Sequence, residues 1–173
     1  MKCCLERWRS AGLRAAACIL MFSAMVGANF VTSCSADTRS DWVQVSAGSE
    51  FSLWAPAGTK FIKRKGIDSF VGEFEGPGFN LRFDYGAYAN PLDNDGNAQA
   101  YETEDLMVGD NQARLVTSYA PQRDDEFPYF IGMHFGDLGE TVIGTRKLTI
   151  SARVKGTEDY ALVKEIFSTI RFN

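Results

Sequence analysis

The fold is decided by the stretch SFVGEFEGPGFNLRFDY, residues 69–85. From residue 79 onward apolar and polar side chains alternate, which is the period-two pattern of a strand with one buried face. The apolar members of this alternation are Phe79, Leu81, Phe83 and Tyr85. Gly76-Pro77-Gly78 supplies a turn between two such runs. The stretch therefore predicts an antiparallel hairpin that joins Ser69–Glu75 to Phe79–Tyr85.

Alternating runs separated by turn residues predict further strands on both sides of this hairpin. They lie at Asp41–Val45, Phe51–Trp54, Lys60–Arg64, Asp105–Val108, Ala113–Tyr119, Tyr129–Phe135 and Lys147–Arg153. The turn at residues 109–112 predicts a second hairpin. We expect these strands to form one antiparallel sheet.

A C-terminal helix follows the last of these strands. Thr157 is a suitable N-cap residue, and an apolar stripe repeats at helical spacing after it. The stripe consists of Leu162, Val163, Ile166, Phe167 and Ile170. The tail at residues 170–172 is expected either to add an edge strand or to pack as an extension. The chain of 173 residues is long enough for one core, so we predict a single α+β domain over 41–173.

The N-terminus has the pattern of an export signal. Residues 1–14 are basic, and Ala15–Ala36 contains 22 residues without a charge. Val31-Thr32-Ser33-Cys34 resembles the bacterial lipobox. The resemblance implies a signal peptide over 1–33, acyl chains on Cys34, a linker over 34–40 and a membrane tether through that lipid. Ser35, where Asp would retain the protein at the inner membrane, favours the outer membrane, with the domain facing the periplasm.

Two other interpretations of the N-terminus stay open. Ordinary cleavage at a small-residue site would release a free periplasmic or secreted protein. An uncleaved segment would be a transmembrane anchor, because about 20 apolar residues can cross a bilayer.

Cysteine content and charge exclude several function classes. All four cysteines lie within the first 34 residues, so the domain over 41–173 has no cysteine thiol for thiol catalysis, zinc binding or iron–sulfur clusters. Residues 34–173 carry 14 Lys+Arg and 21 Asp+Glu, a net charge of −7. This balance disfavours nucleic acid as a partner. We interpret the basic run Lys60, Lys63, Arg64 and Lys65 as the solvated end of a strand.

No catalytic motif is found. His134 is the single histidine, and its place in an alternating strand favours a structural role over a catalytic one. Residues 93–97 resemble a calcium loop, with Asp93, Asp95 and Glu102 at ligand positions. Pro91 occupies the first ligand position, so we interpret the segment as a solvated turn. We assign no catalytic residue, metal or cofactor.

The longest irregular segment is Ala87–Ala100, with Tyr88 near one end and Tyr101 just after the other. Long irregular loops often carry function, and tyrosines are frequent in binding surfaces. We therefore predict a ligand or partner patch at Tyr88 and Tyr101.

The order of segments is similar to that of the PsbP-like α/β sandwich families, which include a photosystem subunit, a nuclear import factor and many bacterial lipoproteins. The likeness is carried by Phe51–Gly58, the strand series and the closing 167–172 segment Phe-Ser-Thr-Ile-Arg-Phe. It implies a non-enzymatic binding or accessory module, whose partner would be an envelope protein or a small ligand. The alternatives are a small envelope hydrolase that uses carboxylates, and a structural envelope factor without a pocket.

Overall fold

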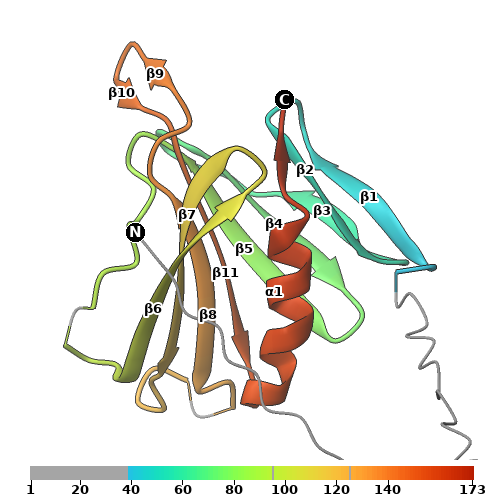
Figure 1. Ribbon diagram of the computed structural model, residues 1–173, viewed down its shortest axis with the longest axis vertical. Coiled ribbons are helices and arrows are strands. Elements are labelled where there is room, and N and C mark those ends of the chain that lie inside the picture. The colour runs from blue at the N-terminus through green and yellow to red at the C-terminus, as the bar shows by residue number, and fades with distance from the viewer. Residues whose placement is uncertain (1–38, 95, 125) are drawn as a thin grey trace, which may run out of the picture. The chain divides into compact units, whose positions relative to one another are not determined.

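The computed structural model describes residues 39–94, 96–124 and 126–173. The predicted signal segment and Cys34 lie outside these residues. The described chain is mostly antiparallel β-sheet with one short α-helix near the C-terminus, which confirms the α+β class (Figure 1). Within the described residues, no helix is long and apolar enough to cross a membrane.

A seven-stranded antiparallel sheet forms one layer. In spatial order it consists of β3 (Lys60–Lys63), β4 (Phe70–Gly76), β5 (Phe79–Gly86), β11 (Lys147–Val154), β8 (Tyr129–Phe135), β7 (Asn111–Tyr119) and β6 (Gln99–Val108). The hairpin at residues 69–85 is confirmed, because Phe70 pairs with Tyr85 and Gly76 pairs with Phe79.

The prediction of one sheet was wrong, because the first two strands belong to a second sheet. This sheet has three strands, β1 (Trp42–Ala47), β2 (Phe51–Pro56) and β12 (Arg171–Phe172). The C-terminal tail pairs with β2, so the expected edge strand is confirmed. Alternation within a strand shows which face is buried but does not show which strand lies next to it. A small ribbon of β9 (Glu140–Thr141) and β10 (Gly144–Thr145) was not predicted.

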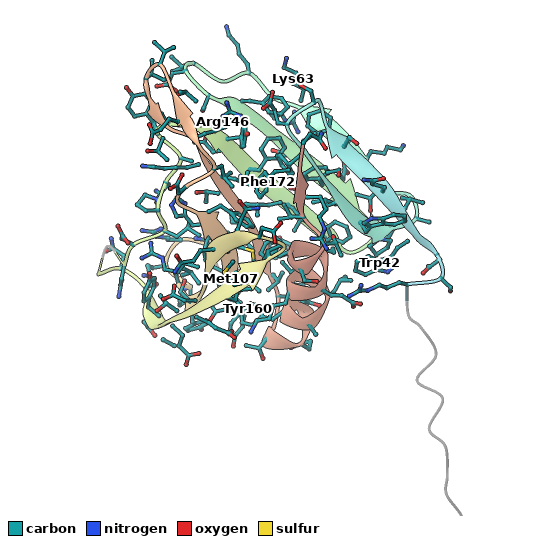
Figure 2. The ribbon with its side chains drawn as sticks, turned by 45° about the horizontal axis from the view of Figure 1, so that its top comes forward. Trp42, Lys63, Met107, Arg146, Tyr160 and Phe172 are labelled. Atoms are coloured by element: carbon teal, nitrogen blue, oxygen red, sulfur yellow. The ribbon has the colours of Figure 1, made fainter. Side chains whose placement is uncertain are left out.

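The core lies between the inner face of the large sheet and a second layer made of β2, β12 and the helix. Phe51 of β2 is fully buried, and its ring centroid lies 5.0 Å from that of Phe83 on β5. Phe172 of β12 packs against Phe135 of β8 at 5.1 Å, in the space between the two layers (Figure 2). T-shaped ring pairs of this kind stabilise a core beyond the area they bury.

The helix begins later than the sequence predicted. Thr157–Asp159 forms a 3₁₀ turn, and α1 covers Tyr160–Ser168 with Asp159 at its N-cap position. Neither cap makes a side-chain hydrogen bond, so the assignment of Thr157 as N-cap was wrong. The predicted apolar stripe is otherwise correct, because Val163, Ile166, Phe167 and Ile170 are buried and Leu162 is partly buried.

Strand β6 is longer than predicted. It begins at Gln99 rather than Asp105, and its register with β7 shifts between Gln99 and Glu102. Most of its residues are exposed because β6 is an edge strand, so the period-two signal is absent over its first half. The irregular segment therefore ends at residue 98. The basic run at residues 60–65 is solvent-exposed at Lys60, Lys63, Arg64 and Lys65, as interpreted from the sequence.

Candidate functional site

The irregular segment after β5 folds back over the outer face of the large sheet. We call residues 89–93 the strap. The backbone N–H of Leu92 donates to Oδ1 of Asn90 at 2.7 Å, and the hydroxyl of Tyr101 donates to the carbonyl of Leu92 at 2.8 Å. Leu92 has a φ of 61°, a conformation that costs a non-glycine residue free energy. Two hydrogen bonds therefore hold the backbone of the strap at Leu92.

His134 of β8 connects the sheet to the strap through Thr149 of β11. The hydroxyl of Thr149 lies 2.5 Å from the carbonyl oxygen of Asn90 and 2.8 Å from Nδ1 of His134. Since a hydroxyl has one proton and the carbonyl can only accept, this geometry assigns the Nδ1–H tautomer to His134. Burial lowers the pKa of His134, and the positive charges of Arg114 and Lys147 lower it further. The neutral imidazole thus donates to Thr149.

Arg114 of β7 holds the other end of the strap. Its Nη2 donates to the carbonyl of Pro91 and to Oδ1 of Asp93, the latter at 2.9 Å. Asp93, one of the candidate calcium ligands, is therefore engaged in an ion pair with a guanidinium. Among the described residues, no group of three His, Cys, Asp or Glu side chains could hold a metal ion.

The two tyrosines singled out in the sequence have different surroundings. Tyr88 is exposed, with 68% of its surface accessible, whereas Tyr101 is half-buried on β6 and uses its hydroxyl to hold the strap. No ring contact joins the two among the described side chains. A binding role for Tyr88 and Tyr101 stays a prediction, and Tyr88 is the member whose ring is free to contact a partner.

The large sheet is split between β5 and β11, its third and fourth strands. The ladder between β5 and β11 ends where Arg82 pairs with Ser151. Beyond that point β5 stays paired with β4 as far as Phe79, and β11 stays paired with β8 as far as Val154. The two halves of the sheet therefore diverge, as the lower part of Figure 1 shows for β5 and β11.

In the split, the first residues of β5 and the last residues of β11 do not pair with each other. In the register of the β5–β11 ladder the next facing residues are Leu81 and Ala152, followed by Asn80 and Arg153, and neither pair forms. In an antiparallel sheet alternate residues direct their N–H and C=O groups to the same neighbour. The backbone bonds from Arg64 to Val71 and from Ala120 to Pro128 show which residues of each strand bond to which neighbour. By the same alternation, Arg82 and Ser151 bond to each other. Asn80 and Arg153, two residues further along their strands, therefore direct their peptide groups into the split.

A groove of about 870 Å³ occupies this split. It is lined by strand residues from both halves of the sheet, by the segment before β8, and by residues of the turn before β5 and of the connection from β11 to α1. The lining residues are Gly78, Phe79, Asn80, Arg82, Asp124, Phe127, Phe130, Ser151, Ala152, Arg153, Val154, Lys155 and Asp159. Its size is typical of ligand sites in proteins. We call it the β5–β11 groove.

Aromatic rings and cations alternate along one wall of the groove. The guanidinium of Arg153 lies 6.0 Å from the ring centroid of Phe130, and Nζ of Lys155 lies 5.2 Å from that of Phe127. Nη1 of Arg153 also donates to the carbonyl of Phe127 at 3.4 Å. These contacts orient flat apolar rings and long cationic side chains toward the same space, which suits a ligand that is partly apolar and carries acceptor groups.

Two carboxylates line the groove among the described residues, and they were not singled out in the sequence. Oδ1 of Asp124 accepts backbone N–H groups from Glu126 at 3.2 Å and from Phe127 at 3.0 Å. Asp124 is therefore the acceptor of an Asx-type turn that fixes the Phe127 segment. Asp159 is the N-cap residue of α1 and makes no side-chain cap hydrogen bond.

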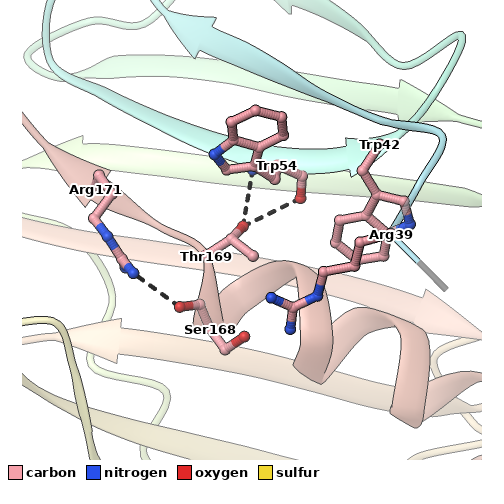
Figure 3. A pocket seen from close by; sticks show the side chains of 6 residues that line it. All are labelled: Arg39, Trp42, Trp54, Ser168, Thr169 and Arg171. Carbon is pink, nitrogen blue, oxygen red and sulfur yellow. Dashed lines mark hydrogen bonds between the residues drawn. The ribbon is translucent and has the colours of Figure 1, made fainter. Parts of the chain in front are cut away.

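A second, smaller pocket lies where the three-stranded sheet meets the end of α1. It has a volume of about 310 Å³ and is lined by Arg39, Trp42, Trp54, Ser168, Thr169 and Arg171 (Figure 3). We call it the tryptophan pocket. Arg39 lies 5.7 Å from the ring centroid of Trp42, and its Nε donates to Oε1 of Glu165 at 2.8 Å. Arg171 donates from Nη1 to the carbonyl of Ile170 at 2.7 Å.

Sequence reasoning missed both the groove and the tryptophan pocket. The groove depends on where the β5–β11 ladder stops, and no residue pattern within either strand marks that point. One signal was present for the tryptophan pocket. Trp54 occupies a polar-face position between Leu53 and Ala55, and an indole at such a position predicts a surface ring.

Comparisons with known proteins assign no family. No family model matches the chain, and no curated protein matches it. One of the matching solved structures is a crystal structure from Bacteroides thetaiotaomicron VPI-5482, with 14% sequence identity and a TM-score of 0.35. The match covers 71% of this chain and 45% of that one, so the chain spans less than half the length of this neighbour.

Proposed function

We propose that this protein is a lipid-anchored binding module of the bacterial cell envelope that holds an extended peptide segment in the β5–β11 groove. The observation that carries the proposal is the interrupted ladder. Asn80 and Arg153, which do not pair with each other, direct their peptide groups into a groove that is also lined by aromatic and cationic side chains. A peptide in extended conformation supplies the missing backbone partners, and this is the usual basis of binding by strand addition.

The charge of the groove favours peptides with acidic or C-terminal carboxylate groups. Arg82, Arg153 and Lys155 are three cationic side chains in the lining, against Asp124 and Asp159. Arg82 lies 3.5 Å from Glu73 and Lys155 lies 3.5 Å from Glu126, so the guanidinium of Arg153 is the cation on which a peptide carboxylate would depend most. Asp124 already accepts two backbone N–H groups, so its charge is partly compensated. A carboxylate on the peptide would gain charge-assisted hydrogen bonds from the guanidinium groups.

The anchor rests on the sequence of the first 34 residues. The uncharged stretch ends at Val31-Thr32-Ser33-Cys34, and a thiol at that position is the acceptor of lipid in the lipobox pattern. The proposed location is the outer membrane, with the domain facing the periplasm. The proposed finer fold is a PsbP-like α/β sandwich. It is supported by the packing of β2, β12 and α1 on one face of the large sheet.

The groove is tested by NMR spectroscopy of the ¹⁵N-labelled protein with a library of short synthetic peptides. We expect peptides with a carboxylate near an apolar residue to shift the amide signals of Asn80 and Arg153. Phe130→Ser should weaken the binding of these peptides about tenfold or more, because an aromatic anchor in the centre of a binding site carries much of the binding free energy.

Met107→Ser is the matched control for Phe130→Ser. Met107 is an exposed apolar residue on β6, at the opposite edge of the sheet from β3 and separated from β11 by β8 and β7. Its substitution should leave peptide affinity unchanged. Peptides that bind equally well to both variants, or that shift amides only outside the groove, would contradict the proposal.

The carboxylate hydrolase is the second candidate function, and the presence of Asp124 and Asp159 in the same groove is the observation that favours it. A hydrolase would cleave bound peptides or glycans and would lose that activity in Asp159→Asn. A binding module would leave the peptides intact and would retain binding in the same variant. Chromatography of the peptide library after incubation distinguishes the two functions.

A further inference from the structure

Both tryptophans that follow Cys34 in the chain meet in one place. The protein has three tryptophans, and Trp8 lies in the predicted signal segment. The other two, Trp42 of β1 and Trp54 of β2, line the tryptophan pocket (Figure 3). Trp54 is 45% exposed, whereas its neighbours Leu53 and Ala55 are fully buried. A large indole left in water on a rigid sheet indicates a surface that another apolar phase covers.

The position of this pocket in the chain relates it to the lipid anchor. Arg39 follows Cys34 by five residues, and an extended chain spans at most about 3.6 Å per residue. The backbone of Arg39 therefore lies within roughly 18 Å of the backbone of Cys34. If Cys34 is acylated, its backbone lies at the level of the lipid headgroups. The pocket lined by Arg39 and Trp42 is then on the side of the domain that is nearest to the bilayer.

The lining of the pocket suits the interface of a membrane. Tryptophan is enriched at the boundary between headgroups and acyl chains, because its ring is apolar and its N–H can remain hydrated. Arginine extends an apolar stem and a charged head in the same zone. Among the described lining residues there is no carboxylate, although residues 34–173 carry a net charge of −7.

The cations of the pocket are already partnered within the protein. Arg39 forms an ion pair with Glu165, and Arg171 donates to carbonyl oxygens at the end of α1. Glu165 compensates the charge of Arg39, whereas the carbonyl acceptors leave the charge of Arg171 in place, so most of the attraction of this surface to a membrane would come from the indole rings. Contact should consequently depend little on the fraction of anionic lipid.

We infer that the tryptophan pocket is a membrane-docking surface, where Trp54 and Trp42 enter the headgroup region of the bilayer that holds the lipid anchor. This inference rests on the proposed anchor. Docking through the pocket fixes the orientation of the domain relative to the membrane. A single flexible tether at Cys34 would leave that orientation free.

The test uses the intrinsic fluorescence of the mature protein reconstituted into phosphatidylcholine vesicles with or without brominated acyl chains. Cleavage before Cys34 removes Trp8, so emission then comes only from Trp42 and Trp54. Trp42→Phe and Trp54→Phe leave one reporter each. We expect bromine to quench Trp54 emission about twofold or more, and to quench Trp42 emission less, since Trp42 is half-buried. Replacing part of the lipid with phosphatidylglycerol should leave the quenching unchanged.

Intact mass separates failure of this inference from failure of the anchor. If Cys34 is acylated and neither tryptophan is quenched, the docking surface is wrong and the anchor stands. If Cys34 carries no acyl chain, the anchor proposal fails. Quenching of the soluble protein by added vesicles then supports the docking surface, and unchanged emission overturns it. A blue shift of Trp54 emission that depends on protein concentration without lipid would identify a second copy as the occupant and would also overturn the inference.

Discussion

The side chain of Thr169 takes the place of a strand residue opposite Trp54. Its Oγ1 lies 2.8 Å from the backbone nitrogen of Trp54 and 3.1 Å from the backbone oxygen of the same residue. Arg171 pairs with Ser52, so Thr169 occupies the position facing Trp54 in the same register. The end of α1 is thereby joined to β2 directly behind the tryptophan pocket.

Loss of this hydroxyl should destabilise the domain. Thr169 is buried, with 7% of its surface exposed, and valine keeps its shape without the hydrogen-bonding oxygen. We expect Thr169→Val to lower the free energy of unfolding by about 1–3 kcal/mol, because the N–H of Trp54 loses its partner. Urea denaturation measures the change. Ser168→Ala, at the exposed neighbouring position, should change stability by less than about 0.5 kcal/mol. Equal effects in the two variants would contradict this role.

Gly132 makes room for the strap on the outer face of the sheet. A Cβ at this position would lie 2.7 Å from Cδ1 of Leu92 and 2.9 Å from the ring of Phe130. We expect Gly132→Ala to lower the free energy of unfolding by about 1–3 kcal/mol, since the added methyl group overfills a packed space. The strap should also become more accessible, which proteolysis at residues 89–93 would detect.

A double-mutant cycle checks that the strap is the cause. Combining Gly132→Ala with Leu92→Ala removes the side chain that collides with the new Cβ. The double variant should therefore lose less free energy of unfolding than the sum of the losses in the two single variants. Gly136→Ala is the control, because a Cβ there would meet His134 at an ordinary contact distance of 3.6 Å. Simple additivity of the two substitutions would contradict the account of the strap.

The low pKa of His134 predicts a loss of stability in acid. Burial and the charges of Arg114 and Lys147 lower the folded-state pKa below the ordinary value of 6.5. As the pH falls below about 6.5, the unfolded chain binds a proton before the folded protein does, so the free energy of unfolding decreases. His134→Asn keeps an N–H near the Nδ1 position and does not titrate. We expect urea midpoints of the variant to depend less on pH between about 7 and 5. Parallel curves for the two proteins would contradict the assignment.

The phenol of Tyr160 predicts an alkaline limit. Burial raises the pKa of Tyr160 to about 12, and the nearby Tyr129 and Glu102 contribute to the rise. Its hydroxyl donates to the carbonyl of Phe130 at 3.1 Å. Between the ordinary value of 10.0 and about 12, the unfolded chain releases this proton and the folded protein retains it, so stability falls as the pH rises. In Tyr160→Phe the denaturation midpoint should depend less on pH over this range. An unchanged slope would show that other groups cause the alkaline loss.

Much of the fold could be predicted from local patterns. The β4–β5 hairpin follows from the strict alternation of β5 and the turn residues before it, and the buried face of α1 follows from helical spacing. The first half of β6 lacked a pattern because both of its faces are largely exposed. The separation of β1 and β2 into their own sheet depends on contacts with β12, more than 100 residues later in the chain.

The candidate sites were less predictable, because each is made by an absence of pairing or by residues distant in sequence. The β5–β11 groove exists because a ladder stops at Arg82, although the same alternating pattern continues to Phe79. The tryptophan pocket joins residues 39–54 to residues 168–171. Tyr101 lies on β6 and its hydroxyl donates to the strap, and a binding role for it stays a prediction.

The measurement that tests the tethered binding module most directly is intact-mass spectrometry of the protein from its native membrane fraction, together with a Cys34→Ala variant. The account predicts a chain that begins at an acylated Cys34, and loss of membrane association in the variant. An unmodified chain that begins at Asn29 or Asp37, or a chain that retains Met1–Ser33, would contradict it.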